Sequence, residues 1–285
     1  MTLTLFAVNT VAWTLPLLAC QLLKLMLPSD AWRRFWSRLQ NGIGTAWISF
    51  NNLALRLLNP VRWDVEGLEG LRSDRWYLVV ANHRSWVDIL VLQRVFNRRI
   101  PFLKFLLKRE LFWVPFLGLA WWALDYPFLE RSSRPDRDLE AIRKAAHRFR
   151  LLPVSVMNFV EGTRFTPEKH RRQHSPYRHL LKPKAGGLVF LLSTMGEEVH
   201  SVLDVTIAYT GEAPSLWGFL CGKTREVMVR VDEVPVGPEL VGDFREDKAF
   251  RRRFTAWLRD LWAAKDGKLT RMSGETSPQE LTGRS

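Results

Sequence analysis

The sequence predicts an α/β fold in which a mixed sheet is flanked by helices and preceded by an N-terminal, membrane-associated helical segment. Two observations support this prediction. Short runs rich in Val, Leu and Phe alternate with helical patterns, and an uncharged apolar stretch opens the chain. Hydrophobic residues make up 47 % of the 285 residues, which excludes a chain that is disordered throughout. We expect transmembrane and amphipathic helices over residues 1–60, one main folded domain over 61–264 and a disordered tail over 265–285.

The opening stretch from Leu3 to Leu23 has no charged residue and is long enough to cross a bilayer as a helix. Lys24 and Arg33 follow it and no Lys or Arg precedes it, so the positive-inside rule predicts a cytoplasmic main domain. In a bacterium this membrane would be the inner membrane. Two alternatives stay open: a buried hydrophobic helix, and a cleaved signal peptide, which normally has the basic N-terminal region that this sequence lacks.

A second apolar run covers residues 111–124 and contains three tryptophans. Its 14 residues are short for a full membrane span. Basic residues precede it, an arrangement that suits the surface of an anionic membrane. Re-entrant, interfacial and buried-core placements all remain open for this run.

The remaining patterns predict the elements of the main domain and a helix before it. A helix is expected at 41–59, then from residue 85 onward, and at 136–150, 186–195 and 244–264. Strands are expected at 76–81, 100–103, 153–160, 202–209 and 226–236. Helices and strands that alternate in this way are typical of a layered α/β domain.

The formal net charge of +13 favours an anionic partner, such as a phosphate compound or an anionic lipid surface. The 13 Trp and 17 Phe favour a membrane surface, and no motif of the common nucleic-acid-binding modules is present, so no specific nucleic-acid partner is expected. Cys20 and Cys221 have neither metal-ligand spacing nor a disulfide framework, and we interpret both as inert. No other set of residues has the spacing of metal ligands.

One polar cluster, Asn82-His83-Arg84-Ser85-Trp86-Val87-Asp88, follows a predicted strand and opens a helix. An imidazole at a strand end can accept a proton from an alcohol at neutral pH, and a nearby carboxylate can hold its tautomer. His83 and Asp88 therefore form a candidate base and orienting pair. Alternatively, Asp88 only completes a capping box with Ser85. A third interpretation, Ser85 as a nucleophile, is disfavoured because the three groups are crowded into one helix entrance.

A second cluster, Glu161-Gly162-Thr163-Arg164, also follows a predicted strand. Glycine permits a tight turn there, and its backbone N–H groups together with Arg164 could hold a phosphate. The alternative is an ordinary turn with a solvated arginine. Arg131 and Lys184 are weaker candidates, because each stands in a short basic string that carries little information alone.

Taken together, the clusters resemble the glycerolipid acyltransferase family, whose members include the 1-acylglycerol-3-phosphate acyltransferases. That family has Asn-His-x4-Asp, an Arg-bearing block, Glu-Gly-Thr-Arg and a hydrophobic fourth block. The corresponding blocks here stand in the same order, at 82–88, 128–131, 161–164 and 202–209. The match covers most of residues 76–210. The fourth block lacks the usual proline and is most similar to a lysophospholipid acyltransferase subgroup.

The resemblance implies roles for the residues of these blocks. His83 would deprotonate the hydroxyl of the acceptor and Asp88 would orient it, without a covalent acyl-enzyme. Arg131, Gly162 and Arg164 would bind the phosphate of the acceptor, with Glu161 shaping the site and Thr163 completing the motif. The oxyanion of the thioester would be stabilised by backbone N–H groups near the helix start or by Lys184.

The resemblance also implies the substrates. Residues 61–264 would be the catalytic domain, transferring an acyl group from acyl-CoA or acyl carrier protein, as co-substrate, to 1-acylglycerol 3-phosphate in phospholipid biosynthesis. No cofactor is implied. The expected partners are membrane phospholipids, the lysophospholipid acceptor and the acyl donor. Two alternatives remain: an acceptor with another headgroup or an amino-lipid, and a membrane scaffold without activity.

Overall fold

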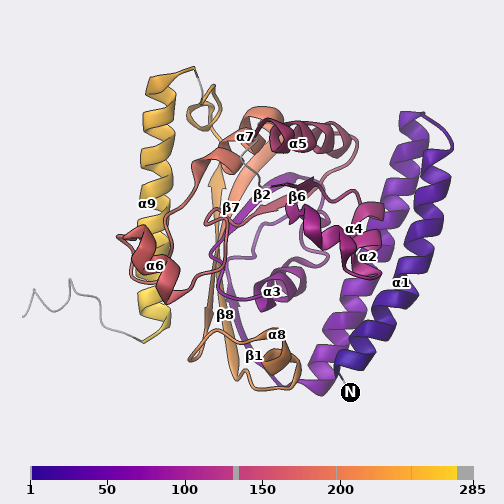
Figure 1. The fold of residues 1–285 in the computed structure, drawn as a ribbon, viewed down its shortest axis with the longest axis horizontal. Helices are drawn as coiled ribbons and strands as arrows, with labels where there is room; N and C mark the ends of the chain where they lie inside the picture. The colour runs from indigo at the N-terminus through magenta and orange to yellow at the C-terminus, as the bar shows by residue number, and fades with distance from the viewer. Residues whose placement is uncertain (1, 131–134, 197, 245, 275–285) are drawn as a thin grey trace, which may run out of the picture.

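The computed structural model describes residues 2–130, 135–196, 198–244 and 246–274 (Figure 1). Its helices are α1 (Thr2–Leu25), α2 (Asp30–Leu58), α3 (Val87–Phe96), η1 (Arg109–Trp113), α4 (Leu117–Ala123), α5 (Pro135–Phe149), α6 (Pro167–Gln173), α7 (Ala185–Met195), α8 (Leu216–Leu220), η2 (Pro238–Leu240) and α9 (Lys248–Met272). Its strands are β1 (Arg62–Glu66), β2 (Trp76–Ala81), β3 (Leu103–Phe105), β4 (Leu107–Lys108), β5 (Phe128–Leu129), β6 (Ser155–Asn158), β7 (Val199–Tyr209) and β8 (Glu226–Pro235).

The main sheet has six strands in the order β1-β8-β7-β2-β6-β3, and β4 pairs with β5 in a separate sheet. β2 runs parallel to both of its neighbours, β6 and β7, whereas β8 runs antiparallel to β7. The α/β prediction of a mixed sheet flanked by helices is therefore confirmed. Because β2, β6 and β7 are parallel, their carboxyl ends meet at one edge of the sheet, where α/β proteins place their functional groups.

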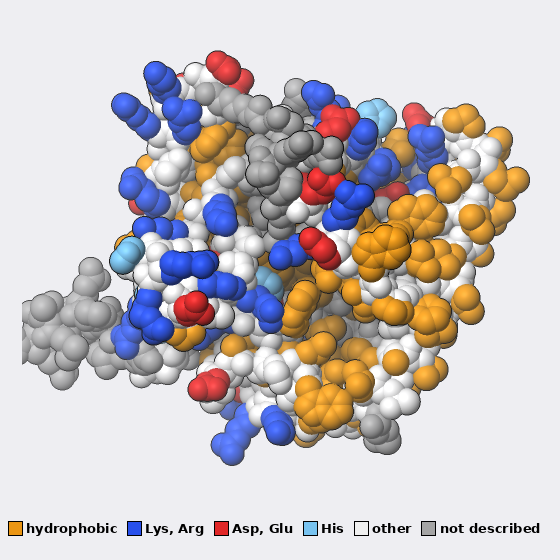
Figure 2. Space-filling model, in the orientation of Figure 1, with side chains coloured by type: hydrophobic (Ala, Val, Ile, Leu, Met, Phe, Trp, Pro, Cys, Tyr) orange, Lys and Arg blue, Asp and Glu red, His pale blue; other side chains and the backbone are white. Residues whose placement is uncertain are grey.

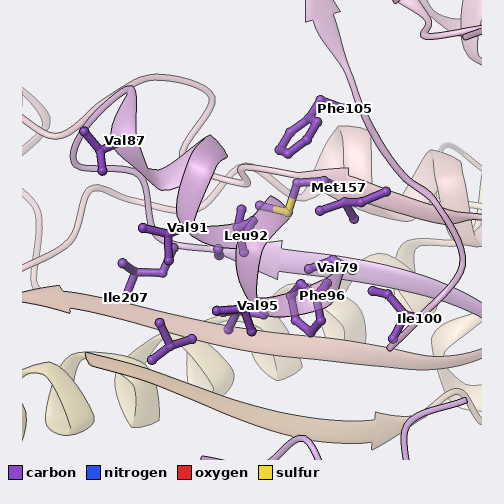
Figure 3. Packing of buried hydrophobic residues seen from close by; sticks show 14 of the residues in the cluster. Val79, Val87, Val91, Leu92, Val95, Phe96, Ile100, Phe105, Met157 and Ile207 are labelled. Atoms are coloured by element: carbon purple, nitrogen blue, oxygen red, sulfur yellow. The ribbon is translucent and has the colours of Figure 1, made fainter. Parts of the chain in front are cut away.

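Helices cover the sheet on both sides (Figure 1). α5, α7 and α9 lie on one side, and α3 lies on the other, between the sheet and the N-terminal helices. In Figure 3 the apolar face of α3, including Val91 and Val95, packs against Val79 of β2 and Ile207 of β7. Complete burial of one such side chain contributes roughly 1.5–3 kcal/mol, so this contact fixes α3 and the loop that leads into it.

The two N-terminal helices, α1 and α2, lie side by side and form a hairpin (Figure 1). Asn9 Nδ2 donates to Asn51 Oδ1 across the hairpin (2.8 Å). At its far end Lys24 forms an ion pair with Asp125, which ties the hairpin to the end of α4. Within the described ranges α1 is the one helix that is long and apolar enough to cross a membrane. Of its most apolar 18-residue stretch, 22 % is buried inside the protein.

Four features differ from the predictions. α2 begins at Asp30 instead of residue 41, because Trp32, Phe35 and Trp36 continue its helical spacing. The run 111–124 is not one segment: η1 and α4 are separated by a turn in which Phe116 has a φ of 60°. β1 was not predicted, and its five residues are at most half-buried, which gives no apolar run to detect.

The fourth difference concerns the C-terminal helix, for which the sequence predicts an end at residue 264. α9 continues to Met272, so the prediction of disorder is wrong for residues 265–272; residues 275–285 lie outside the described part of the chain. The physical reason is Lys265, which is completely buried and pairs with Asp204 of β7 at 2.7 Å. A lysine in a polar stretch of sequence is normally predicted to be exposed to solvent. Lys265 is buried instead, because its countercharge lies inside the fold.

The Lys265–Asp204 pair provides a test of this packing. We expect Lys265→Met to lower the free energy of unfolding by roughly 3–5 kcal/mol, because it leaves the buried carboxylate of Asp204 without a partner. Denaturant unfolding of the purified protein measures this loss. The control is Lys268→Met, since Lys268 pairs with the half-exposed Asp232 and its loss should cost less than about 1 kcal/mol. Equal losses in the two variants would contradict the assignment.

Candidate active site

His83 lies two residues beyond the end of β2, and its side chain is 13 % exposed. Its Nδ1 lies 2.9 Å from Oδ2 of Asp88, which is completely buried. A carboxylate can only accept this hydrogen bond, so the proton of the neutral imidazole resides on Nδ1. Nε2 is then left with a lone pair that can accept a proton from a substrate.

Asp88 also organises the backbone around the histidine. The same Oδ2 accepts hydrogen bonds from the backbone N–H groups of Arg84 (2.7 Å) and Ser85 (2.8 Å). The carboxylate half of the predicted capping box is therefore present. Capping and pairing with His83 are therefore not alternatives, because one oxygen atom does both.

The hydroxyl of Ser85 has other partners. It donates to the carbonyl oxygen of Pro214 and accepts from the backbone N–H of Val87 (3.1 Å). No hydrogen bond joins it to His83 in the described part of the chain. This geometry gives no support to a serine nucleophile.

Glu161 is completely buried and joins two loops of the site. Its Oε1 accepts from the backbone N–H of His83 and its Oε2 from that of Leu181, each at 3.0 Å. Burial raises the pKa of this carboxyl group to about 7. Glu161 therefore positions the histidine loop, residues 82–86, against the segment before α7, and both of its oxygens are engaged within the protein. Its role in shaping a phosphate site stays a prediction.

In the rest of the Glu-Gly-Thr-Arg turn, Thr163 is hydrogen-bonded within the protein and Arg164 is exposed. Gly162 has a φ of 71°, which favours glycine. Thr163 Oγ1 accepts from Lys169 Nζ (2.8 Å), whereas the guanidinium of Arg164 lies 5.0 Å over the ring of Trp86. Arg164 thus brings the turn against the histidine loop.

Two cations of the site face solvent. Arg164 and Lys184 are exposed, and neither forms an ion pair with an acidic side chain among the described residues. Lys184 lies beside the turn, because a Cβ added to Gly162 would be 3.4 Å from its Nζ. Arg131 lies outside the described residues.

Sequence reasoning did not identify three further contacts. The side chain of Asn82 exchanges two hydrogen bonds with the backbone of Ile207, both at 2.9 Å, and fastens the histidine loop to β7. Phe159 stacks on the His83 ring with centroids 3.9 Å apart. The hydroxyl of Tyr209 donates to Oδ1 of Asp88 (2.6 Å). Asn82 and Tyr209 belong to blocks that the sequence singled out, but only the order of strands reveals their contacts.

An apolar cavity of about 700 Å³ opens beside this cluster. Its walls come from α1, α2, α3, α4 and α8, and they include Phe6, Trp47, Leu90, Trp121 and Leu216. Phe105 lines the cavity and stacks toward Phe159, with centroids 6.4 Å apart, and Phe159 in turn stacks on His83. The imidazole is therefore one aromatic ring away from the cavity wall.

No group of three or more His, Cys, Asp or Glu side chains within the described ranges is arranged to hold a metal ion. Cys20 is buried, Cys221 is exposed, and the two are free cysteines. That the chain needs no metal or cofactor, and that both thiols are inert, stay predictions.

The model of the acyltransferase family matches residues 62–210, which include the histidine loop, the Glu-Gly-Thr-Arg turn and Tyr209. The chain belongs to this family. The resemblance to glycerolipid acyltransferases is thereby confirmed, and curated relatives agree. The chain is 30 % identical over 202 residues to the 1-acyl-sn-glycerol-3-phosphate acyltransferase gamma of Mus musculus, a match that covers 66 % of this chain and 51 % of that protein.

A second relative is the 1-acyl-sn-glycerol-3-phosphate acyltransferase 3 of Arabidopsis thaliana, 28 % identical over 227 residues, or 72 % of this chain and 56 % of that protein. The chain thus spans about half the length of these curated relatives. Among solved structures, the 1-acyl-sn-glycerophosphate acyltransferase PlsC from Thermotoga maritima matches with a TM-score of 0.47 and 19 % identity, over 93 % of this chain and 98 % of that one.

The raised pKa of Glu161 predicts a pH dependence of stability. Its folded pKa of about 7 exceeds the ordinary value of 4.5, so the folded state keeps a proton that the unfolded state releases. Stability should therefore fall by up to about 3 kcal/mol as pH rises from 4.5 through 7. Unfolding measured across this range should show the fall in the parent protein, and Glu161→Gln should lose this component. Glu168→Gln, which changes an exposed carboxylate of α6, should keep it.

Proposed function

We propose that the protein transfers an acyl group from a thioester to the free hydroxyl of 1-acylglycerol 3-phosphate, in phospholipid biosynthesis. The observation that carries the proposal is a histidine paired with a buried carboxylate beside an apolar cavity, in a chain of the acyltransferase family. The names of its relatives supply the acceptor. Acyl-CoA and acyl carrier protein are both retained as donors.

In the proposed reaction, Nε2 of His83 removes the proton of the acceptor hydroxyl as its oxygen attacks the carbonyl carbon of the thioester. Asp88 stabilises the imidazolium that forms. The tetrahedral intermediate then collapses, its carbon–sulfur bond breaks, and the thiolate takes the proton from His83. The products are the diacyl lipid and the free thiol. A positioned general base typically contributes ~10²–10⁴ in rate.

Two cations would stabilise the charged groups of the substrates. Arg164 is exposed beside the histidine loop, where it would bind the phosphate of the acceptor, with Arg131 as a further ligand. The backbone N–H groups of His83, Arg84 and Ser85 are already bonded to carboxylate oxygens. These three groups are therefore poor candidates for the thioester oxyanion, which Lys184 would stabilise.

The apolar cavity would hold the fatty chain of the donor. Its lining is largely hydrophobic, and burial of a fatty chain there is favoured by roughly 0.8 kcal/mol for each methylene group. The stack of Phe105, Phe159 and His83 would place the carbonyl group near the base.

We also propose that the α1–α2 hairpin enters the membrane. Hydrophobic side chains cover α1 and α2 in Figure 2, and Val8, Leu15 and Leu57 are each more than 60 % exposed. The contacts of α1 with α2 and α4 support its retention in the mature protein rather than cleavage as a signal peptide. Arg33 and Arg34, near the turn of the hairpin, suit the negatively charged cytoplasmic leaflet, so we propose that the hairpin lies in that leaflet and that the catalytic domain is cytoplasmic. Lys and Arg gather over α6 and α9 in Figure 2, and these would attract the anionic substrates.

The central experiment measures thiol release from palmitoyl-CoA and oleoyl-CoA by detergent-solubilised protein, with lysophosphatidate or other lysophospholipids as acceptors. We expect acceptor-dependent release that falls by ~10²–10⁴ in His83→Ala, because the base is lost. His200→Ala is the control, since His200 is exposed at the opposite end of β7. Full activity in His83→Ala would overturn the mechanism, and no release with any acceptor or donor, carrier protein included, would favour the scaffold.

The cavity predicts a change in chain-length preference. In Leu90→Trp the larger ring should occupy part of the cavity, so the preferred acyl-CoA should become shorter while the acceptor preference stays the same. The measurement is kcat/KM for a series of saturated acyl-CoA donors. Leu57→Trp, on the exposed face of α2, should keep the parent preference. If both variants keep it, the fatty chain binds elsewhere.

A further inference from the structure

Tyr209, the last residue of β7, has a contact that the proposed reaction does not use. Its hydroxyl donates to Oδ1 of Asp88 at 2.6 Å, and the ring is buried in the core cluster that includes Val91 of α3. The other oxygen of Asp88 accepts from His83, Arg84 and Ser85. In the part of the chain that the structure describes, Tyr209 supplies the one hydrogen bond to Oδ1.

The position of Tyr209 follows from the register of the sheet. β7 lies parallel to β2, and Ala81 at the end of β2 is opposite Val205. Asn82 then binds the backbone of Ile207. Tyr209 is two residues farther along and therefore on the same face of the strand as Ile207, which places it level with the start of α3.

The charges around the phenol keep it in its donor form. Burial, followed by the nearby carboxylate of Asp88, raises the pKa of Tyr209 well above its ordinary value, and Arg84 opposes this shift. On the side of the histidine, Glu161 accepts a hydrogen bond from the backbone N–H of His83, and the charge of Lys265 opposes the rise in the pKa of Glu161. Tyr209 therefore stays protonated at neutral pH and donates to a charged acceptor.

We propose that Tyr209 is a positioning residue for acyl transfer: its hydroxyl holds Oδ1 of Asp88, so that Oδ2 stays directed at Nδ1 of His83. This inference rests on the proposed function. The hydrogen bond has two consequences for His83. It restricts rotation of the carboxylate, and it withdraws negative charge from the atom that faces the imidazole.

Tyr209→Phe keeps the ring and removes the hydroxyl. The plateau value of kcat should fall about 10- to 100-fold, as expected for loss of a hydrogen bond to a charged group, with the KM for the donor unchanged. Without the donor, the carboxylate of Asp88 is more basic and stabilises the imidazolium more strongly. The pKa of His83 should therefore rise, and the acidic limb of the kcat/KM profile should move to higher pH.

The matched control is Tyr77→Phe. Tyr77 is buried in the same core cluster, and its hydroxyl accepts from the backbone N–H of Arg72 (3.0 Å), away from Asp88. This variant should lose stability without a shift in the pH profile. In an Asp88→Ala background, Tyr209→Phe should have no further effect on kcat. Tyr209 is merely structural if Tyr209→Phe, like Tyr77→Phe, leaves the pH profile unshifted. The same conclusion follows if Tyr209→Phe still lowers kcat in the Asp88→Ala background.

A second readout needs no turnover. The protein has six histidines, so ¹³C-labelled histidine gives a small set of NMR signals. The signal that disappears in His83→Gln is that of His83. The pKa of His83 should be higher in Tyr209→Phe than in the parent and in Tyr77→Phe. An unchanged value overturns the role of Tyr209. If the parent shows no acceptor-dependent thiol release, the proposed function fails, and this titration still decides whether Tyr209 acts on the pair.

Discussion

A completely buried carboxylate, Asp88, is the constraint on which the rest of the site depends. An ionised group without water must be satisfied by donors, because an unpaired buried charge costs several kcal/mol. Four donors meet it: the imidazole of His83, two backbone N–H groups of the loop after β2, and the hydroxyl of Tyr209. The loop cannot change its shape without uncovering this charge, so the geometry of the base is set before any substrate binds.

The sheet brings these donors together. β2 lies between β6 and β7, and each of the three parallel strands ends in residues of the site. Asn82 fastens the histidine loop to β7, whereas Glu161, in the turn that follows β6, fastens it to the segment before α7. The loop is thus held from both neighbouring strands. Arg164 and Lys184, which face solvent on the same side, are left to interact with a substrate.

Local sequence patterns predicted the features that depend on residues close together in the chain. His83 and Asp88 are five residues apart, and the strand that precedes them is a continuous apolar run, so the pair, its capping alternative and the fold class could all be read from the sequence. The contacts of Tyr209 and Asn82 span more than 120 residues and depend on the order of strands, which no local pattern contains. Lys265 was wrongly assigned to a solvated tail for a related reason, because its countercharge, Asp204 of β7, is also far from it in the chain.

The cavity changes how the N-terminal helices should be understood. A membrane anchor that only tethers a domain can be exchanged for another without effect on the chemistry. Here α1 and α2 contribute Phe6 and Trp47 to the wall of the cavity, which Leu90 of α3 also lines. Without them, the apolar lining of α3 would face water, and an acyl chain would lose most of the burial that favours its binding. The hairpin is therefore part of the proposed substrate site as well as the proposed membrane contact. The ion pair between Lys24 and Asp125 also supports this site, because it ties α1 to the end of α4, and both helices line the cavity.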